Sequence, residues 1–378
     1  MWDIQLFKLN FDEREAAAVS DVLASGWIAM GERIIKFESE FELFLGGDAR
    51  CVAVSNGTAA LHMALLALGV GAGDEVIIPS LTFVADVNTV LLAGAKPVLA
   101  DCTSLDDWNV SAAEIERLIT PQTKAVIIVH YAGFPCADTA AISALCAGKS
   151  IGLIEDVAHA PGAMVSGKAC GTWGDVGCFS FFANKNLSVG EGGMVSTCDD
   201  GLYAKLRSLR SHGMTTLTLD RHSGRAISYD VVEPGLNYRM DEMRAAIGSV
   251  QLDKLPVGNA ARATLTDRYR SNLIDSDISI PFCGQPEHST AAYHILPVLL
   301  PYSTDRVAVI NSLKAKGIQT SIHYPPFWSF TAFKDQFAKT DCPITAEICD
   351  RQLTLPLFPT MTVEEVDLVT CAIKEALI

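Results

Sequence analysis

Between residues 51 and 156 the sequence alternates short apolar runs with segments of helical periodicity. The apolar runs predict strands at residues 51–54, 75–79, 97–101, 125–129 and 151–156. The segments between them predict helices at residues 58–68, 85–93, 111–118 and 140–147. Strands that alternate with helices form a largely parallel sheet with both faces covered. The sequence therefore predicts an α/β fold whose ligands bind at the carboxyl ends of the strands.

A chain of 378 residues is too long for one small core, so we expect two domains. Further elements are predicted outside the alternating region: helices at 12–25, 34–44, 241–255 and 305–316, and a strand at 293–300. The residues at 256–259, Pro-Val-Gly-Asn, are typical of a boundary. We expect residues 1–255 to form an N-terminal segment with a large domain, and residues 256–378 to form a small α+β domain.

Composition and charge exclude several classes of protein. A net charge of −15 repels phosphate backbones, so nucleic acid is not an expected partner. The N-terminus has an early acid and no secretory-signal pattern, and no run of about 18 apolar residues predicts a membrane span. Eleven scattered cysteines without a Cys-x-x-Cys pair predict reduced thiols, and no His/Cys cluster predicts a metal site. We expect a cytoplasmic protein.

One lysine stands where a buried strand would give way to turns. Residues 179–182 are Phe-Ser-Phe-Phe, and Lys185 follows them, ahead of a glycine cluster at 190–193. Desolvation lowers the pKa of an amine and makes lysine a nucleophile that forms Schiff bases with aldehydes and ketones. The glycines would let the backbone approach a flat ligand closely. A solvated lysine at an ordinary strand end remains the alternative for this stretch alone.

Other strand ends carry residues suited to the same ligand. Residues 55–61 (SNGTAAL) place a glycine, a threonine hydroxyl and free N–H groups at a helix N-terminus, which either bind a phosphate or form an ordinary N-cap. Asp156 ends a strand 29 residues before Lys185, about one strand-crossover-strand unit, so both can reach one sheet edge. Phe83 could stack on a flat ring or pack in the core. His159 could bind the ligand or be structural.

These motifs, in this order, resemble the DegT/DnrJ/EryC1/StrS family of pyridoxal-phosphate (PLP) dependent sugar aminotransferases. The resemblance rests on residues 55–61, 155–159 (EDVAH), 180–186 (SFFANKN), 190–194 (GEGGM) and 235–240 (GLNYRM). It implies the aspartate-aminotransferase fold, fold type I. It also implies roles at the cofactor: Lys185 for the Schiff base, Asp156 for the pyridine nitrogen, His159 near the phenolic oxygen, Phe83 for stacking, and Gly57, Thr58, Ala59 and Ser180 for the phosphate.

The resemblance further implies a reaction and an assembly. PLP would accept an amino group from an amino acid, with glutamate the expected donor, and the resulting pyridoxamine phosphate (PMP) would aminate a keto sugar, expected to be nucleotide-linked. Asn237 would reach the cofactor phosphate of a neighbouring subunit, which implies a homodimer with shared sites. The expected sugar-site residues are Trp27, Arg239, His323 and Tyr324.

Two other functions remain open from the sequence: a PLP-dependent sugar dehydratase and a non-catalytic regulatory protein. Some relatives that dehydrate rather than transaminate carry histidine in place of the lysine, so Lys185 speaks against a dehydratase. Intact Lys185 and Asp156 speak against the second. Glu32, Ala132 and Cys136 depart from the family pattern, and these departures leave the identity of the sugar open.

Overall fold

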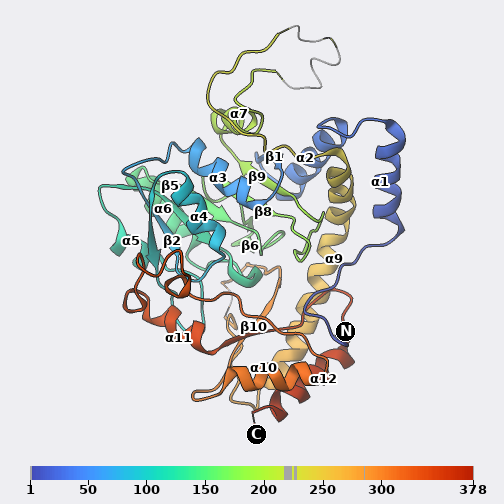
Figure 1. The fold of residues 1–378 in the computed structure, drawn as a ribbon, viewed down its shortest axis with the longest axis vertical. Coiled ribbons are helices and arrows are strands. Elements are labelled where there is room, and N and C mark those ends of the chain that lie inside the picture. The colour runs from blue at the N-terminus through green and yellow to red at the C-terminus, as the bar shows by residue number, and fades with distance from the viewer. Residues whose placement is uncertain (1, 217–223, 225–227, 285, 378) are drawn as a thin grey trace.

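The computed structural model describes residues 2–216, 224, 228–284 and 286–377. Within these residues the largest element is a seven-stranded sheet in the order β1-β9-β8-β5-β4-β2-β3 (Figure 1). Only β9 runs antiparallel to its neighbours. The strands are β1 (Arg50–Val54), β2 (Glu75–Pro79), β3 (Lys96–Ala100), β4 (Thr123–Val129), β5 (Gly152–Asp156), β8 (Val176–Ser180) and β9 (Gly193–Thr197). The predicted α/β fold with a mostly parallel sheet is confirmed.

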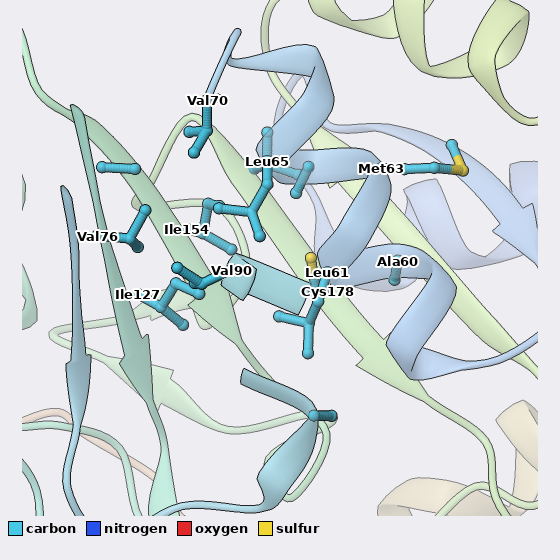
Figure 2. Packing of buried hydrophobic residues seen from close by; sticks show 14 of the residues in the cluster. Ala60, Leu61, Met63, Leu65, Val70, Val76, Val90, Ile127, Ile154 and Cys178 are labelled. Carbon is cyan, nitrogen blue, oxygen red and sulfur yellow. The ribbon is translucent and has the colours of Figure 1, made fainter. Parts of the chain in front are cut away.

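Helices cover both faces of this sheet. The helices of this part are α1 (Glu13–Ser25), α2 (Glu32–Leu45), α3 (Gly57–Ala67), α4 (Val84–Leu92), α5 (Ala112–Leu118), α6 (Thr139–Lys149) and α7 (Asp200–Leu209). Because side chains alternate across a strand, Ile127 packs towards α3 and α4, whereas Val126 and Ile128 pack towards α5 and α6. Figure 2 shows the first of these clusters, with Leu61 and Leu65 of α3 facing Ile127 and Ile154 of the sheet.

A third cluster supports the strand that leads to Lys185. Phe37 and Phe41 of α2 pack against the β8 strand and the residue after it, with ring centroids 4.9 Å apart for Phe41 and Phe179 and 5.5 Å apart for Phe37 and Phe181. All four rings are buried. The aromatic run that predicted a strand therefore anchors β8 on its α2 side.

The C-terminal part has a separate core. It contains α10 (Arg306–Ala315), α11 (Pro343–Arg351), α12 (Val363–Glu375) and a two-stranded sheet of β10 (Leu296–Leu299) and β11 (Gln352–Leu355). The end of α9 (Glu242–Leu273) and Ile4 near the N-terminus pack into the same cluster. Figure 1 shows α9 running from the large sheet down to α10 and α12.

The helix expected to end at Leu255 was predicted too short. α9 continues through Pro256 to Leu273 and is 32 residues long. Proline removes one helical hydrogen bond and disfavours a helix interior, but here Leu252 and Leu255 before it and Leu265 after it are buried, and their packing outweighs the local cost. The division of the chain at residue 256 remains a prediction, and one continuous helix crosses it.

Other boundaries differ by a few residues, and some elements had no sequence signal strong enough to predict them. The strand expected at 293–300 is limited to Leu296–Leu299. The strand β9, the two-residue pair β6 (Met164–Val165) and β7 (Lys168–Ala169), and the elements α7, α11, β11 and α12 were not predicted. All eleven cysteines are free thiols, eight of them buried. No helix among the described residues is long and apolar enough to cross a membrane.

Candidate active site

The carboxyl ends of neighbouring strands bring the predicted residues to one edge of the sheet. β8 pairs with β5 in parallel, so Asp156 at the end of β5 lies beside Cys178, two residues before β8 ends at Ser180. β2 ends at Pro79, shortly before Phe83, and β1 ends at Val54, directly before the 55–61 motif. The prediction that Lys185 and Asp156 share an edge agrees with this topology.

A short turn presents Lys185 directly after β8. The Lys185 N–H donates to the Phe182 carbonyl at 2.9 Å, and the Phe181 N–H donates to the Gly192 carbonyl at 2.8 Å. These bonds close the chain into a tight loop between β8 and β9. The loop therefore holds the lysine at a fixed position above the sheet edge.

The lysine amine is desolvated and faces one carboxylate charge. Burial lowers the pKa of Lys185 to about 8, and the nearby Asp156 charge opposes this shift. No carboxylate of the described residues makes an ion pair with its Nζ. At pH 7 a pKa of 8 leaves about a tenth of the lysine as free amine, against less than about a thousandth for an unperturbed lysine. The site thus raises the population of the nucleophilic form.

Asp156 is almost completely buried, and groups around it favour its charged form. Burial raises its pKa, against the Ala158 N–H, which donates to Oδ1 at 2.8 Å, and against the charges of Lys185 and His130. A carboxylate fixed in this way can hydrogen-bond a protonated ring nitrogen and stabilise its positive charge.

His159 and Tyr324 form a hydrogen-bonded pair beside the lysine. The Ala132 N–H donates to His159 Nδ1 at 3.2 Å, and His159 Nε2 lies 2.9 Å from the Tyr324 hydroxyl. Burial lowers the pKa of His159 well below its usual value, and the Lys185 charge lowers it further. In the neutral ring an accepting Nδ1 requires a protonated Nε2, so Nε2–H donates to Tyr324 and leaves the tyrosine O–H free to donate onward. Ala132, which departs from the family pattern, thus orients His159 through its backbone N–H.

Phe83 lies against Tyr324 at this edge. The two ring centroids are 5.5 Å apart, and Phe83 remains 52% exposed. A core phenylalanine would be buried, so the alternative of core packing for Phe83 is not what the structure shows. An exposed ring held against a second aromatic residue is suited to cover a flat ligand.

The phosphate motif forms a narrow backbone cradle. A Cβ atom at Gly57 would lie 2.8 Å from the Ser180 Cβ, so only glycine allows this approach of β8 and α3. Asn56 caps α3 by accepting the Ala59 N–H at 2.8 Å, which commits the amide of Ala59. The amides of Gly57 and Thr58, with the two hydroxyls of Thr58 and Ser180, remain suited to an anion at the helix N-terminus.

Two of the glycines after Lys185 allow other parts of the chain to approach closely. A Cβ at Gly193 would lie 2.7 Å from the Asn56 carbonyl and 2.8 Å from the Phe179 carbonyl, and a Cβ at Gly192 would lie 2.4 Å from Val189. The close approach that these glycines allow is to neighbouring parts of the chain. They let β9 fit between β1 and β8.

Several polar residues around Lys185 were not found from the sequence. Asn186 donates through Nδ2 to Asn259 Oδ1 of α9 at 2.8 Å and to the Ala292 carbonyl at 2.7 Å, and its Oδ1 lies 2.9 Å from His294 Nδ1. Tyr131 donates its hydroxyl to the His323 carbonyl. These partners are far from residue 185 in sequence, and no local pattern predicts them.

The predicted sugar residues fall into two groups. Burial lowers the pKa of His323 to about 4, and the charge of Lys185 contributes to this shift, which indicates that His323 lies near Lys185. Arg239 lies at the end of β1, where it forms a bridge with Val54. Trp27 precedes Ile28, whose carbonyl accepts the N–H of Glu242 at the start of α9. The side chain of Asn237 in the same segment is exposed.

The residues present fit the expected cofactor. The cradle at Gly57 suits a phosphate, the exposed Phe83 ring suits a planar heterocycle, and the desolvated Lys185 amine suits an aldehyde. The buried Oδ1 atom of Asn184 has no hydrogen-bond partner among the described residues. A polar ligand bound beside it could supply the missing hydrogen bond. No cluster of three or more His, Cys, Asp or Glu side chains that could hold a metal ion occurs in the described part of the chain.

A mostly parallel sheet with its lysine in the turn before an antiparallel strand defines a PLP enzyme of fold type I. The chain belongs to the DegT/DnrJ/EryC1/StrS aminotransferase family, whose model matches residues 10–374. It is therefore a PLP-dependent sugar aminotransferase, and its cofactor alternates between PLP and PMP.

Solved structures of relatives cover the whole chain. The aminotransferase TlmJ from Streptoalloteichus hindustanus is 33% identical, with 100% of this chain and 99% of that chain covered and a TM-score of 0.90. Spr1654 from Streptococcus pneumoniae in its PMP form is 30% identical over 97% of both chains, with a TM-score of 0.90. Helicobacter pylori PseC, an aminotransferase involved in pseudoaminic acid biosynthesis, is 26% identical over 99% of both chains, with a TM-score of 0.90.

Proposed function

We propose that this enzyme transfers the amino group of L-glutamate to the keto group of a nucleotide-linked sugar, as a cytoplasmic homodimer. The observation that carries the proposal is the desolvated amine of Lys185 facing Asp156 at one sheet edge. Involvement of a similar protein, PseC, in pseudoaminic acid biosynthesis supports a sugar acceptor.

Lys185 is proposed to hold the cofactor and to move the proton. When bound, PLP supplies an aldehyde that takes up amines and a ring that withdraws electrons from the reacting carbon. Lys185 attacks as the free amine, and once an amino acid has displaced it, its Nζ accepts the proton from the Cα atom and returns a proton to the cofactor side. A pKa of about 8 suits a base that must both take up and release protons near neutral pH.

The surrounding side chains are proposed to orient the ring. Asp156 would keep the pyridine nitrogen of the bound cofactor protonated, and the Phe83 ring would cover the cofactor ring. The neutral His159 donates to Tyr324, which leaves the tyrosine hydroxyl to donate towards the cofactor or the sugar. Gly57, Thr58, Ala59 and Ser180 would hold the phosphate, although the Ala59 amide is already used in the helix cap.

The sugar is proposed to lie between the two groups of predicted residues, with His323 and Tyr324 on one side and Trp27 and Arg239 on the other. The exposed side chain of Asn237 supports a contact with the phosphate site of a second subunit. In such a dimer each site would be completed by the partner. The division into domains 1–255 and 256–378 belongs to the same proposal.

Two successive half-reactions test this proposal. Purified enzyme loaded with PLP should show the visible absorption of the lysine-bound cofactor, and L-glutamate without a sugar should bleach it and yield 2-oxoglutarate. A panel of nucleotide-linked keto sugars should then restore the band and give an amino sugar detectable by mass spectrometry. If alanine or aspartate bleached the band and glutamate did not, glutamate would not be the donor. If amino sugar formed only from keto sugars without a nucleotide, the acceptor would not be nucleotide-linked.

A further inference from the structure

Asp86 is a buried acid that has no role in the function above, and its charge would interact with that of Asp156. Asp86 is in the first turn of α4, three residues after Phe83, and is 0% exposed. Thr82 Oγ1 donates to its Oδ2 at 2.5 Å, whereas Oδ1 has no hydrogen-bond partner among the described residues. Buried polar atoms are normally paired, so an unpaired carboxyl oxygen at this position requires an explanation.

The groups that face Asp86 give it no positive partner. They are Asp156 on β5, Cys178 on β8 and Tyr324 in the C-terminal part of the chain. Burial raises the pKa of Asp86 well above its usual value, the charge of Asp156 raises it further, and the Thr82 hydroxyl opposes both. The N-terminus of α4 favours a negative charge in its first turn, but this effect is about 1 kcal/mol or less in most settings.

The two carboxyl groups differ in what can stabilise a negative charge. Asp156 accepts the Ala158 N–H and is near the charges of Lys185 and His130. Asp86 accepts a hydrogen bond only from the neutral hydroxyl of Thr82 among the described residues. When two buried carboxyl groups interact, the proton stays on the one with the poorer environment for charge. In this pair the proton therefore belongs on Asp86 and the charge on Asp156.

We propose that Asp86 is a positioning residue that remains a neutral acid, so that the Asp86–Asp156 pair carries a single negative charge. The inference rests on the proposed role of Asp156 at the pyridine nitrogen. A second negative charge beside Asp156 would make its carboxylate more basic and draw the proton from the ring nitrogen onto Asp156. Neutral Asp86 thus keeps that proton on the ring, where the electron-withdrawing chemistry requires it.

Infrared spectroscopy tests the protonation of Asp86 directly. The PLP-loaded wild-type enzyme at pH 7 should show the C=O stretch of a protonated carboxyl group, with the downshift that D₂O causes. Asp86→Asn should lose this band, and Asp107→Asn should keep it. Asp107 is a matched control because burial raises its pKa as well, at a position outside the proposed site. A wild-type spectrum without the band would overturn the inference.

Cofactor affinity and pH dependence give a second readout. Asparagine imitates the neutral acid, so the PLP dissociation constant of Asp86→Asn should change by less than about tenfold at pH 7. The apoenzyme of this variant should also lose less stability than the wild type as pH rises above 5, because a carboxyl group whose pKa rises on folding stabilises the fold only while it is protonated. Parallel stability curves, or loss of PLP binding by Asp86→Asn at pH 7, would overturn the inference.

A second variant keeps the test possible if Asp86→Asn does not fold. Asp86→Thr introduces a neutral side chain of similar volume, and it should lose the infrared band and flatten the same dependence of stability on pH. These readouts do not depend on glutamate or a sugar. If the half-reactions fail while the band is present, the proposed function is wrong and the neutral acid stands. If the half-reactions succeed without the band, the inference about Asp86 alone is wrong.

Discussion

Two lysines of this protein are withdrawn from solvent, in surroundings of opposite kinds. At the junction of α1 and α9, Lys254 Nζ lies 2.6 Å from Glu15 Oε1 and 3.0 Å from Asp12 Oδ2, and it donates to the Asn10 carbonyl at 2.9 Å. At the sheet edge, Lys185 has no ion-pair partner among the described residues, and its pKa falls to about 8.

The difference separates a structural lysine from a reactive one. Around Lys254 every oxygen of Glu15 is used, because Gln251 Nε2 also donates to Oε1 and the Asp12 N–H donates to Oε2. A fully paired network stabilises a junction but leaves nothing for a substrate. Around Lys185 the pairing is incomplete, and a group that the protein leaves without a partner is available to a ligand.

Replacing Lys185 should have the largest effect on catalysis. Lys185→Met should lower the turnover number by at least about 10⁴-fold, because both the covalent link and the proton carrier are lost. The same change should not lower the free energy of unfolding of the apoenzyme, since it removes a desolvated amine with no ion pair. Steady-state kinetics and urea denaturation measure the two quantities. Lys254→Met, the matched control, should keep the visible cofactor band, and equal activity losses in both variants would refute the contrast.

Replacing Lys254 should have the largest effect on stability. Lys254→Met leaves the buried Glu15 carboxylate without its cation and should lower the free energy of unfolding by about 3 kcal/mol. Adding Glu15→Gln removes the unpaired buried charge, so the double variant should regain part of the lost free energy of unfolding. A double-mutant cycle by chemical denaturation measures the coupling. Additive effects of the two changes would show that the ion pair contributes little.

The acid dependence of stability should show a smaller effect of the same junction. Burial acts to raise the pKa of Glu15, but the Asp12 N–H and Lys254 outweigh it, and the pKa in the fold is lowered. A carboxyl group with a lowered pKa contributes its stability above its unfolded value of about 4 and loses it as pH falls through the folded value. Between pH 6 and pH 3 the wild type should therefore lose more stability than Glu15→Gln in thermal denaturation. A steeper loss in the variant would have the wrong sign.

The parts of the fold and site that the sequence predicted share a local signal. Five buried strands and the helices between them followed from apolar periodicity, and the order of strand ends predicted that Lys185 and Asp156 share an edge. The strand β9 was not predicted, because Gly192 and Gly193 are typical of a loop. In the fold, these glycines permit close packing of the strand. The second half of α9 was not predicted, because Pro256 is a strong local signal for the end of a helix. Packing on both sides of the proline outweighs this signal.

The missing site residues depend on contacts between distant segments. Asn186 contacts Asn259 of α9 and also His294, which lie 73 and 108 residues further along the chain. Asp86 did leave a trace, since it is an acid among the apolar residues Ala85, Val87 and Val90 of a predicted helix. An acid in an apolar helix segment is a sequence signal of a buried carboxyl group, and here the structure places it near the charge of a second acid, Asp156.

The continuous α9 helix limits how this protein can be dissected. Leu252 and Leu255 belong to the cluster that supports the lysine loop, whereas Leu265, Tyr269 and Leu273 of the same helix belong to the C-terminal cluster. Separate expression of either side from a cut at residue 256 would leave each fragment with a truncated helix and an uncovered apolar face. Recombinant work on the two parts therefore requires the intact polypeptide.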